Sequence, residues 1–136
     1  MTITKNISTF LLSTAMSVAL FSTPAVAGKA EIKELKKATK TCQKVHPSSV
    51  EGCALAFSRR HGNCLACHAI QGGSLAGNWG PPLVAMKARF PDKSKLRAQI
   101  WDSTVANPVS SMPPFGKHNI IKESEIDKIT NFIHSL

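Results

Sequence analysis

The run Cys64-Leu65-Ala66-Cys67-His68 constrains this chain more than any other feature of its sequence. Two cysteines separated by two residues and followed at once by a histidine are the attachment pattern of a c-type haem. At ~100° per residue of a helix, both thiols lie on one side and His68 lies ~40° from Cys64, one turn on. The thiols can then add to the two haem vinyl groups while the imidazole reaches the iron as an axial ligand. The motif predicts one covalently bound haem c, held by Cys64 and Cys67, with His68 on the iron.

Residues 1–27 have the pattern of a secretory signal peptide. Lys5 is their only charge, an apolar run extends from Phe10 to Phe21, and Ala25-Val26-Ala27 supplies an A-x-A site. The alternative is a membrane anchor, but serine and threonine interrupt the run, which falls short of the ~20 residues that a spanning helix needs. We expect cleavage after Ala27 and a periplasmic protein with no membrane span after cleavage.

Three other uses of the cysteine pair in the motif are less well supported. A thioredoxin-like redox pair would lie within a βαβ pattern, and none surrounds the motif. A zinc site would need a second C-x-x-C or a spaced histidine pair to complete it. The third alternative is an incidental disulfide. Export favours haem over all three, because bacterial haem attachment takes place on the periplasmic side.

Cys42 and Cys53 lie outside the haem motif. Two remaining thiols in an oxidising compartment predict an intramolecular disulfide. It would close a loop of about a dozen residues and contribute roughly 2–3 kcal/mol to stability. The alternatives are two free thiols or a link to another chain. A catalytic thiol is less well supported, since nothing in the sequence indicates the lowered pKa that it would need.

The rest of the chain shows helical periodicity and no strand pattern of useful length. Helices are expected at 29–45, 51–61, 83–89, about 93–104 and 123–136. A glycine-rich loop follows His68 and ends in Gly80-Pro81-Pro82-Leu83, and prolines exclude regular structure from residues 106–119. The pattern therefore predicts an all-α fold around the haem.

The chain is strongly basic, with a formal net charge of +9. Nucleic-acid binding is a poor explanation for an exported protein. A basic face could steer an acidic protein partner, and a solvated helix face without a partner is the other interpretation. The sequence leaves both open. Six of the lysines lie close together near the expected new N-terminus: Lys29, Lys33, Lys36, Lys37, Lys40 and Lys44.

The second axial position of the iron decides the chemistry of such a site, because an open position permits gas binding or catalysis and a filled one favours electron transfer. Met112 is the best candidate, since it is far from His68 in sequence and two following prolines would stiffen its loop. His118 is a competing ligand. Met86 lies in an expected helix, where a methionine more often fills the core.

Together, these segments resemble class I cytochromes c, and more narrowly SoxX, the monohaem subunit of the thiosulfate-oxidising SoxAX complex. The resemblance covers roughly residues 50 to 136. C-x-x-C-H is common to all c-type cytochromes, whereas the other motifs are narrower. The matching segments are Gly62-Asn63-Cys64-Leu65-Ala66-Cys67-His68-Ala69-Ile70, Gly77-Asn78-Trp79-Gly80-Pro81-Pro82-Leu83, Met112-Pro113-Pro114-Phe115-Gly116-Lys117-His118 and Glu125-Ile126-Asp127-Lys128-Ile129.

The resemblance implies a class I cytochrome c-like fold with His68 and Met112 as axial ligands. It also implies that a backbone carbonyl of Pro82, or of its neighbour Pro81, orients the His68 imidazole. The expected domains are a signal peptide at 1–27, a basic helical extension at 28–49 and a cytochrome c domain at 50–136.

SoxX-like proteins pair with SoxA, a dihaem or monohaem cytochrome that carries the active-site cysteine ligand. The pair conjugates thiosulfate to a cysteine of a carrier protein. The resemblance implies that this chain is the non-catalytic subunit, which accepts the released electrons and passes them to a downstream cytochrome. A freestanding periplasmic electron carrier to a terminal oxidase or reductase is the alternative. A haem enzyme with an open iron, such as a peroxidase, would require that Met112 does not ligate.

Two features depart from the family pattern. Lys122 stands where related sequences usually have threonine or serine as the N-cap of the last helix, so we expect a weak cap. The basic segment with Cys42 and Cys53 lies before the matched region, and the resemblance supplies no role for it.

Overall fold

A computed structural model describes residues 24–136 of the chain. The expected signal peptide at 1–27 therefore lies almost entirely outside the described residues. Within them no helix is both long enough and apolar enough to cross a membrane. The ordered elements are α1 (Pro24–Val45), α2 (Val50–Phe57), the 3₁₀ turn η1 (Cys64–Ala66), α3 (Met86–Arg89), α4 (Lys93–Trp101) and α5 (Glu123–His134).

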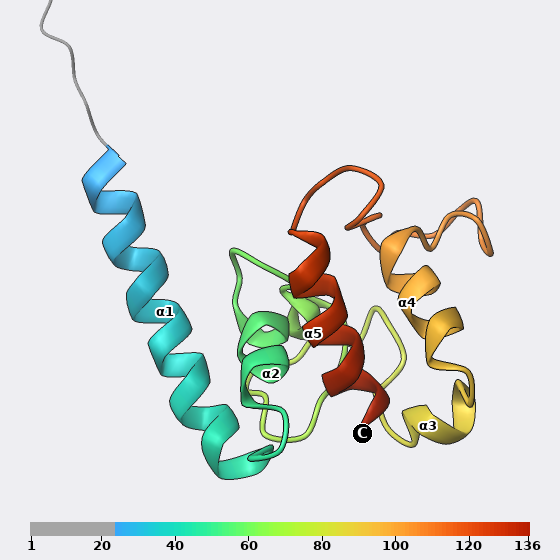
Figure 1. Ribbon diagram of the computed structural model, residues 1–136, viewed down its shortest axis with the longest axis horizontal. Coiled ribbons are helices and arrows are strands. Elements are labelled where there is room, and N and C mark those ends of the chain that lie inside the picture. The colour runs from blue at the N-terminus through green and yellow to red at the C-terminus, as the bar shows by residue number, and fades with distance from the viewer. Residues whose placement is uncertain (1–23) are drawn as a thin grey trace, which may run out of the picture.

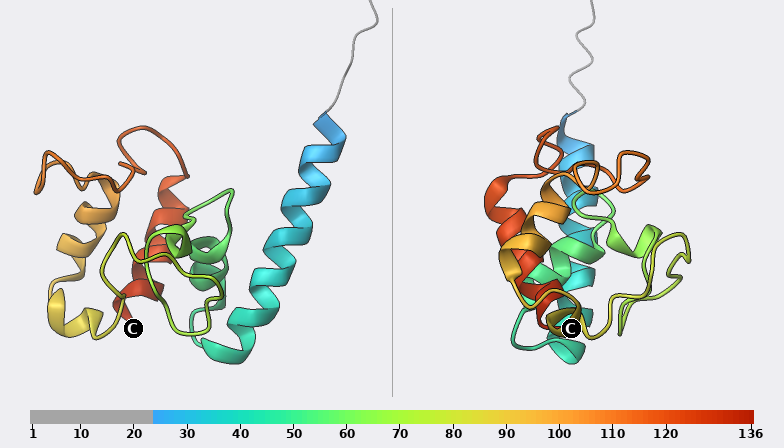
Figure 2. Two further views of the ribbon diagram at one scale, coloured as in Figure 1. Left: turned by 180° about the vertical axis from the view of Figure 1, so that it is seen from behind. Right: turned by 90° about the vertical axis from the view of Figure 1, so that its right-hand side faces the viewer.

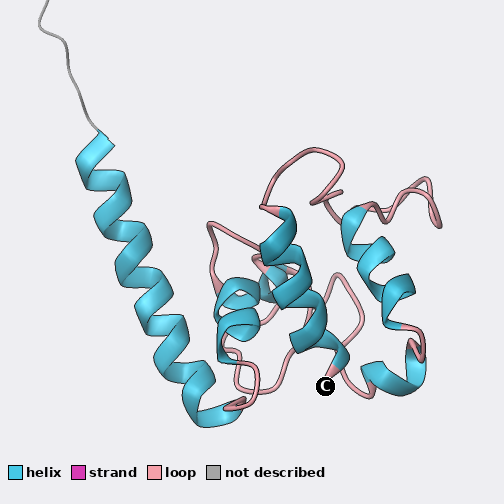
Figure 3. Cartoon of the chain, in the orientation of Figure 1, coloured by secondary structure: helices cyan, strands magenta, loops and turns pink. Residues whose placement is uncertain are grey.

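The structure confirms the all-α prediction, because helices and loops account for the whole described range (Figure 3). The helices are shorter than their periodicity suggests where the backbone turns. Helix α2 ends at Phe57, since Ser58 is extended and Asn63 has a left-handed backbone with φ of 48°. Helix α3 starts only at Met86, after Ala85 with φ of 51°. Local turns that periodicity cannot detect therefore set both boundaries.

Helices α2 and α5 cross at the centre of the body. A Cβ atom on Gly52 would overlap the backbone carbonyl of Lys128, so glycine allows the two helices to approach closely. Phe132 of α5 is fully buried at this crossing and packs edge-on against Phe57 and the His46 ring. The crossing places the apolar face of α5, including Ile129 and Ile133, against the interior.

Helix α1 lies along one side of the body, and its N-terminal end extends beyond the other helices (Figures 1 and 2). Leu35 and Ala38 pack against the core, and Cys42 is completely buried. Cys42 forms a disulfide with Cys53 of α2, with their Cα atoms 5.8 Å apart. The predicted disulfide is confirmed, and it fixes the C-terminal half of α1 to α2.

The start of α5 bears out the expectation of a weak cap. Lys122 makes no side-chain capping bond, because an ammonium group has donors but no acceptor. Glu125 supplies half of a capping arrangement, since its Oε2 accepts a hydrogen bond from the Lys122 backbone N–H at 2.9 Å. Further along, Arg97 of α4 donates to Asp127 at 2.6 Å and to Glu123 at 2.7 Å, which joins α4 to α5.

Candidate haem-binding site

A cavity of about 970 Å³ lies between the motif turn, the helices α3, α4 and α5, and the loop that contains Met112. Ligand pockets in proteins commonly measure roughly 300–1,000 Å³, so this one is large enough for a macrocycle. The four residues predicted to hold the haem and its iron all line it: Cys64, Cys67, His68 and Met112. Much of the remaining wall is apolar, including Leu96 and Ile100 of α4 and Ile129 and Ile133 of α5.

The motif forms a tight turn that starts after the left-handed residue Asn63. Backbone N–H groups of Cys67 and His68 both donate to the Cys64 carbonyl, at 3.2 and 2.9 Å. Neither cysteine of the motif forms a disulfide within residues 24–136, which argues against the incidental disulfide. Burial raises the pKa of the Cys64 thiol to about 12. That thiol is protonated at neutral pH, unlike the reactive thiolate of a thioredoxin-like pair.

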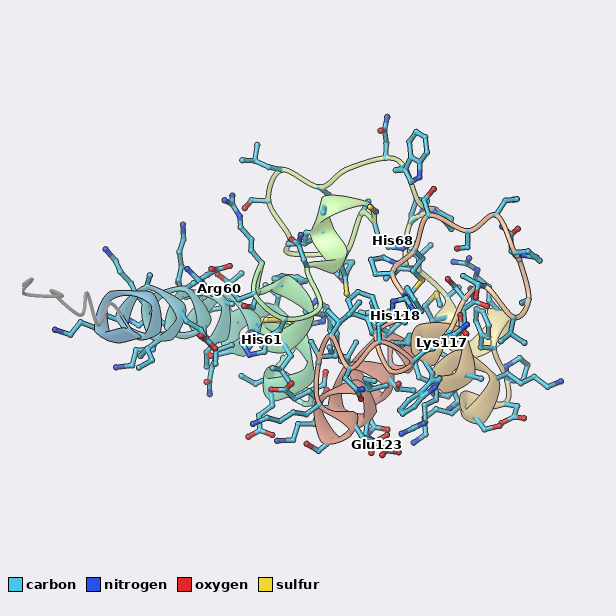
Figure 4. The ribbon with its side chains drawn as sticks, turned by 90° about the horizontal axis from the view of Figure 1, so that it is seen from above. Arg60, His61, His68, Lys117, His118 and Glu123 are labelled. Carbon is cyan, nitrogen blue, oxygen red and sulfur yellow. A yellow bond between two sulfur atoms is a disulfide. The ribbon has the colours of Figure 1, made fainter. Side chains whose placement is uncertain are left out.

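The His68 ring is fixed by one main-chain hydrogen bond, 2.7 Å long, between its Nδ1 and the Pro81 carbonyl. A carbonyl can only accept, so Nδ1 carries the proton and Nε2 keeps its lone pair for a metal. Gly80 lies directly against the ring, and a Cβ atom there would overlap it. Figure 4 shows His68 well away from Arg60 and His61, which lie near α1.

Of the two neighbouring carbonyls that the resemblance allows, the structure gives this contact to Pro81 and not to Pro82. The His68 partner is Pro81, and the Pro82 carbonyl instead accepts a hydrogen bond from Arg89 Nη1 at 2.9 Å. Adjacent carbonyls in this loop serve different partners, and only that of Pro81 faces the imidazole. The sequence signal for this contact was present in the Gly80-Pro81 pair, since only a residue without a side chain lets the loop approach the ring so closely.

Met112 lies in a loop that side-chain hydrogen bonds hold in place. Ser103, which is fully buried, donates to the Met112 carbonyl at 3.0 Å and lies 2.9 Å from the Ser110 hydroxyl. The Met112 N–H donates to Ser110 Oγ at 3.2 Å. Two serines therefore fix the backbone on both sides of the thioether, in a segment that has no regular secondary structure.

An ion pair holds the base of the same loop. Lys117 Nζ lies 2.8 Å from Asp102 Oδ2, and the Thr104 N–H donates to Asp102 Oδ1 at 3.0 Å. These contacts, with Lys117 the stronger, lower the pKa of Asp102 to about 2. Gly116 also donates to the Trp101 carbonyl at 3.1 Å. Both ends of the loop are thus fixed to the end of α4, an arrangement that sequence spacing alone does not reveal.

The two competing ligands differ from Met112 in their surroundings. Met86 also lines the cavity, but it is almost completely buried and its sulfur receives a contact from Arg89 Nη1 at 3.3 Å. This buried environment is typical of a methionine that fills the core. His118 is exposed and is not part of the cavity wall. Met112 therefore stays the predicted second axial ligand.

The family model described as "Cytochrome C oxidase, cbb3-type, subunit III" matches residues 56–133. This chain belongs to that cytochrome c family. The match includes the attachment motif, the Met112 loop and nearly all of α5, and it leaves α1 outside. A comparison with curated proteins found no match. The chain is a class I c-type cytochrome, and electron transfer through covalently bound haem c is the activity that this family supports.

The residues around the cavity fit that cofactor. Two unpaired thiols, an imidazole with a free Nε2 and a thioether line one largely apolar cavity. Bound haem c would supply a one-electron redox centre. The chain's own part would be to orient the predicted ligand His68 through Pro81 and to hold Met112 through Ser103 and Ser110.

Proposed function

We propose that this chain is the SoxX-like, electron-transfer subunit of a SoxAX-type L-cysteine S-thiosulfotransferase. Its partner would be a SoxA-like dihaem or monohaem cytochrome, bound as a heterodimer. The partner would carry out the conjugation of thiosulfate to a carrier-protein cysteine. This chain would accept the electrons released there and pass them to a downstream cytochrome. It would carry one haem, because the sequence contains one C-x-x-C-H run.

The Met112 loop is the observation that carries this proposal. Its Met-Pro-Pro-Phe-Gly sequence is the narrowest element of the SoxX resemblance, and Ser103 and Ser110 fix the Met112 backbone at the cavity wall. A thioether on the iron fills the position that a substrate would need and raises the reduction potential relative to imidazole. These properties suit a subunit that accepts electrons, and they weigh against an open-iron enzyme such as a peroxidase.

Co-expression with a SoxA-like chain tests the proposal. We expect a stable heterodimer on gel filtration and reduction of the haem of this chain when thiosulfate and the carrier protein are added together. Omission of the carrier protein is the control and should leave the haem oxidised. A chain that stays monomeric beside such a partner, yet delivers electrons to an oxidase, would refute the SoxAX role.

The second candidate is a freestanding carrier that serves a terminal oxidase or reductase. The description of the matched family, which names an oxidase subunit, favours it. Both candidates require the same His68 and Met112 ligation, so spectroscopy of the haem does not separate them. The two candidates are separated by identifying the captured partner protein and by the functions of the genes adjacent to this one.

Export forms part of the same proposal. Residues 1–27 would be removed after Ala27, residues 28–49 would form a basic extension, and residues 50–136 would form the cytochrome c domain in the periplasm. A disulfide between Cys42 and Cys53 supports this location, because such bonds persist in oxidising compartments. Mass spectrometry of the purified protein would locate its N-terminus, and an intact Met1 would contradict the cleavage.

A further inference from the structure

All six lysines of α1 lie on one exposed face of the helix. At ~100° per residue they fall within an arc of ~100° and extend over ~22 Å of the helix axis. All of them are exposed to solvent. We call this face the lysine stripe; its members are Lys29, Lys33, Lys36, Lys37, Lys40 and Lys44.

The opposite face of α1 is used to attach the helix to the body. Leu35 and Ala38 pack against the core, and Cys42 forms the disulfide to α2. The two acidic residues of the helix also face inward. Glu34 accepts a hydrogen bond from the Arg59 backbone N–H at 2.6 Å, and Glu31 lies 3.8 Å from His61 Nε2. Neither carboxylate forms an ion pair with a lysine of the stripe.

The rest of the described chain supplies no counter-charge to the stripe. The sequence has eight acidic residues, and each one contacts a group other than these lysines. Besides Glu31 and Glu34, the pairs are Glu51 with Lys128, Asp92 with Ser94, Asp102 with Lys117, Glu123 and Asp127 with Arg97, and Glu125 with Lys122 and His61.

This distribution differs from that of an ordinary solvated helix. A helix face that is merely exposed commonly mixes charges of both signs, and lysines three or four residues apart repel one another. Here the helix places both carboxylates on its inner face and keeps every lysine on the outer one. A disulfide holds the helix in place, so the stripe is presented in a fixed orientation.

We infer that the lysine stripe is a docking surface for a protein partner with a complementary acidic face. A bilayer is a poorer occupant, since the apolar side of α1 is already packed against α2. Among the side chains of α1 from residue 28 on, Ile32 is the one large apolar side chain that is exposed, at 56%. Bilayer binding by an amphipathic helix needs a free apolar face to insert. An acidic protein surface needs only the charges that the stripe presents.

The stripe is separate from the place where electrons would enter or leave. None of its lysines lines the haem cavity, whose rim carries the exposed apolar residues Trp79 and Val109, at 78% and 87%. Capture of the partner and electron exchange would therefore use different surfaces. The inference requires an electron-transfer cytochrome but not the SoxAX complex, so it can fail or succeed independently of the proposed function.

Binding of a synthetic acidic helix to the haem-loaded full protein tests the inference. The probe is a helical peptide with glutamates at every third or fourth position, and its Kd is measured by titration calorimetry at about 20 mM salt and about 200 mM salt. We expect Lys36→Gln/Lys40→Gln to weaken binding by about three- to tenfold at low salt. The matched control, Lys87→Gln/Lys95→Gln, removes the same charge from α3 and α4 and should change the Kd less than about twofold.

Two further measurements separate the remaining explanations. The haem spectrum and the thermal midpoint of both variants should match those of the parent, which shows that the loss is local to the surface. Binding of the protein to vesicles of phosphatidylcholine with about one third phosphatidylglycerol tests whether the stripe binds a membrane instead. The inference is overturned if both double variants weaken binding equally or if the peptide does not bind at all. Tighter binding of the protein to vesicles than to the peptide would also overturn it.

Discussion

The two sides of the cavity are constructed differently. On the motif side, His68 follows directly from a five-residue run and is oriented by one backbone carbonyl, that of Pro81. On the other side, Met112 depends on a loop of irregular structure whose shape is set by Ser103, Ser110 and the Asp102–Lys117 ion pair. The position of the first predicted ligand depends on local sequence, and that of the second depends on tertiary contacts. Changes on the two sides should therefore have different consequences.

Met112→Ala should have the largest effect. We expect the oxidised protein to lose its long-wavelength Met–iron charge-transfer band completely and its reduction potential to fall, because the thioether stabilises ferrous iron. Covalent attachment through Cys64 and Cys67 should be unaffected. Optical spectroscopy and redox titration measure both effects, and Met86→Leu is the control. A band that survives in Met112→Ala and disappears in Met86→Leu would assign the ligand to Met86.

Gly80→Ala should disturb the motif side in a different way. The added Cβ would overlap the His68 ring, so the ring or the loop must move, at a cost of about 1–3 kcal/mol in stability. Denaturant unfolding of the haem-loaded protein measures this cost. Gly28→Ala is the control, since a Cβ there meets no atom within 4 Å. Equal stability of the two variants would show that the ring is not tightly held.

Ser103→Ala should loosen the Met112 side without removing any ligand. It leaves the Met112 carbonyl without the hydroxyl that donates to it, and the loss of a buried hydrogen bond costs about 1–2 kcal/mol. We expect the charge-transfer band to persist at low temperature and to disappear on heating earlier than in the parent. Ser124→Ala, at an exposed position, is the matched control. Identical heating curves for both variants would show that Ser103 does not hold the loop in place.

The Asp102–Lys117 pair should make the smallest contribution, and one that depends on pH. The folded-state pKa of Asp102 is about 2, below its ordinary 3.8. Its stabilisation is therefore fully present above about pH 4 and is lost as pH falls toward 2. Asp102→Asn should remove that part of the acid sensitivity, so the difference in stability between parent and variant should shrink from pH 5 to pH 2. A constant difference across this range would contradict the assignment.

The contrast between the two sides also explains what the sequence could predict. The motif, the helical periodicity and the Cys42–Cys53 pair led to the all-α fold, the cavity-lining residues Cys64, Cys67 and His68, and the disulfide. Each of these depends on spacing or on residue type. The choice of Pro81 over Pro82, and the roles of Ser103 and Asp102, depend on which groups meet after folding. Periodicity contains no information about such contacts.

Two of the four cysteines must be oxidised in the finished protein and two must stay reduced until haem is attached. The disulfide and the attachment motif are close in sequence, so exchange between them would yield a wrongly paired chain without haem. The fold opposes this exchange, because Cys42 and Cys53 are completely buried and their disulfide is shielded from an attacking thiolate. Formation of the α1–α2 bridge before haem attachment would thus protect the assembly of the cytochrome as well as stabilise it.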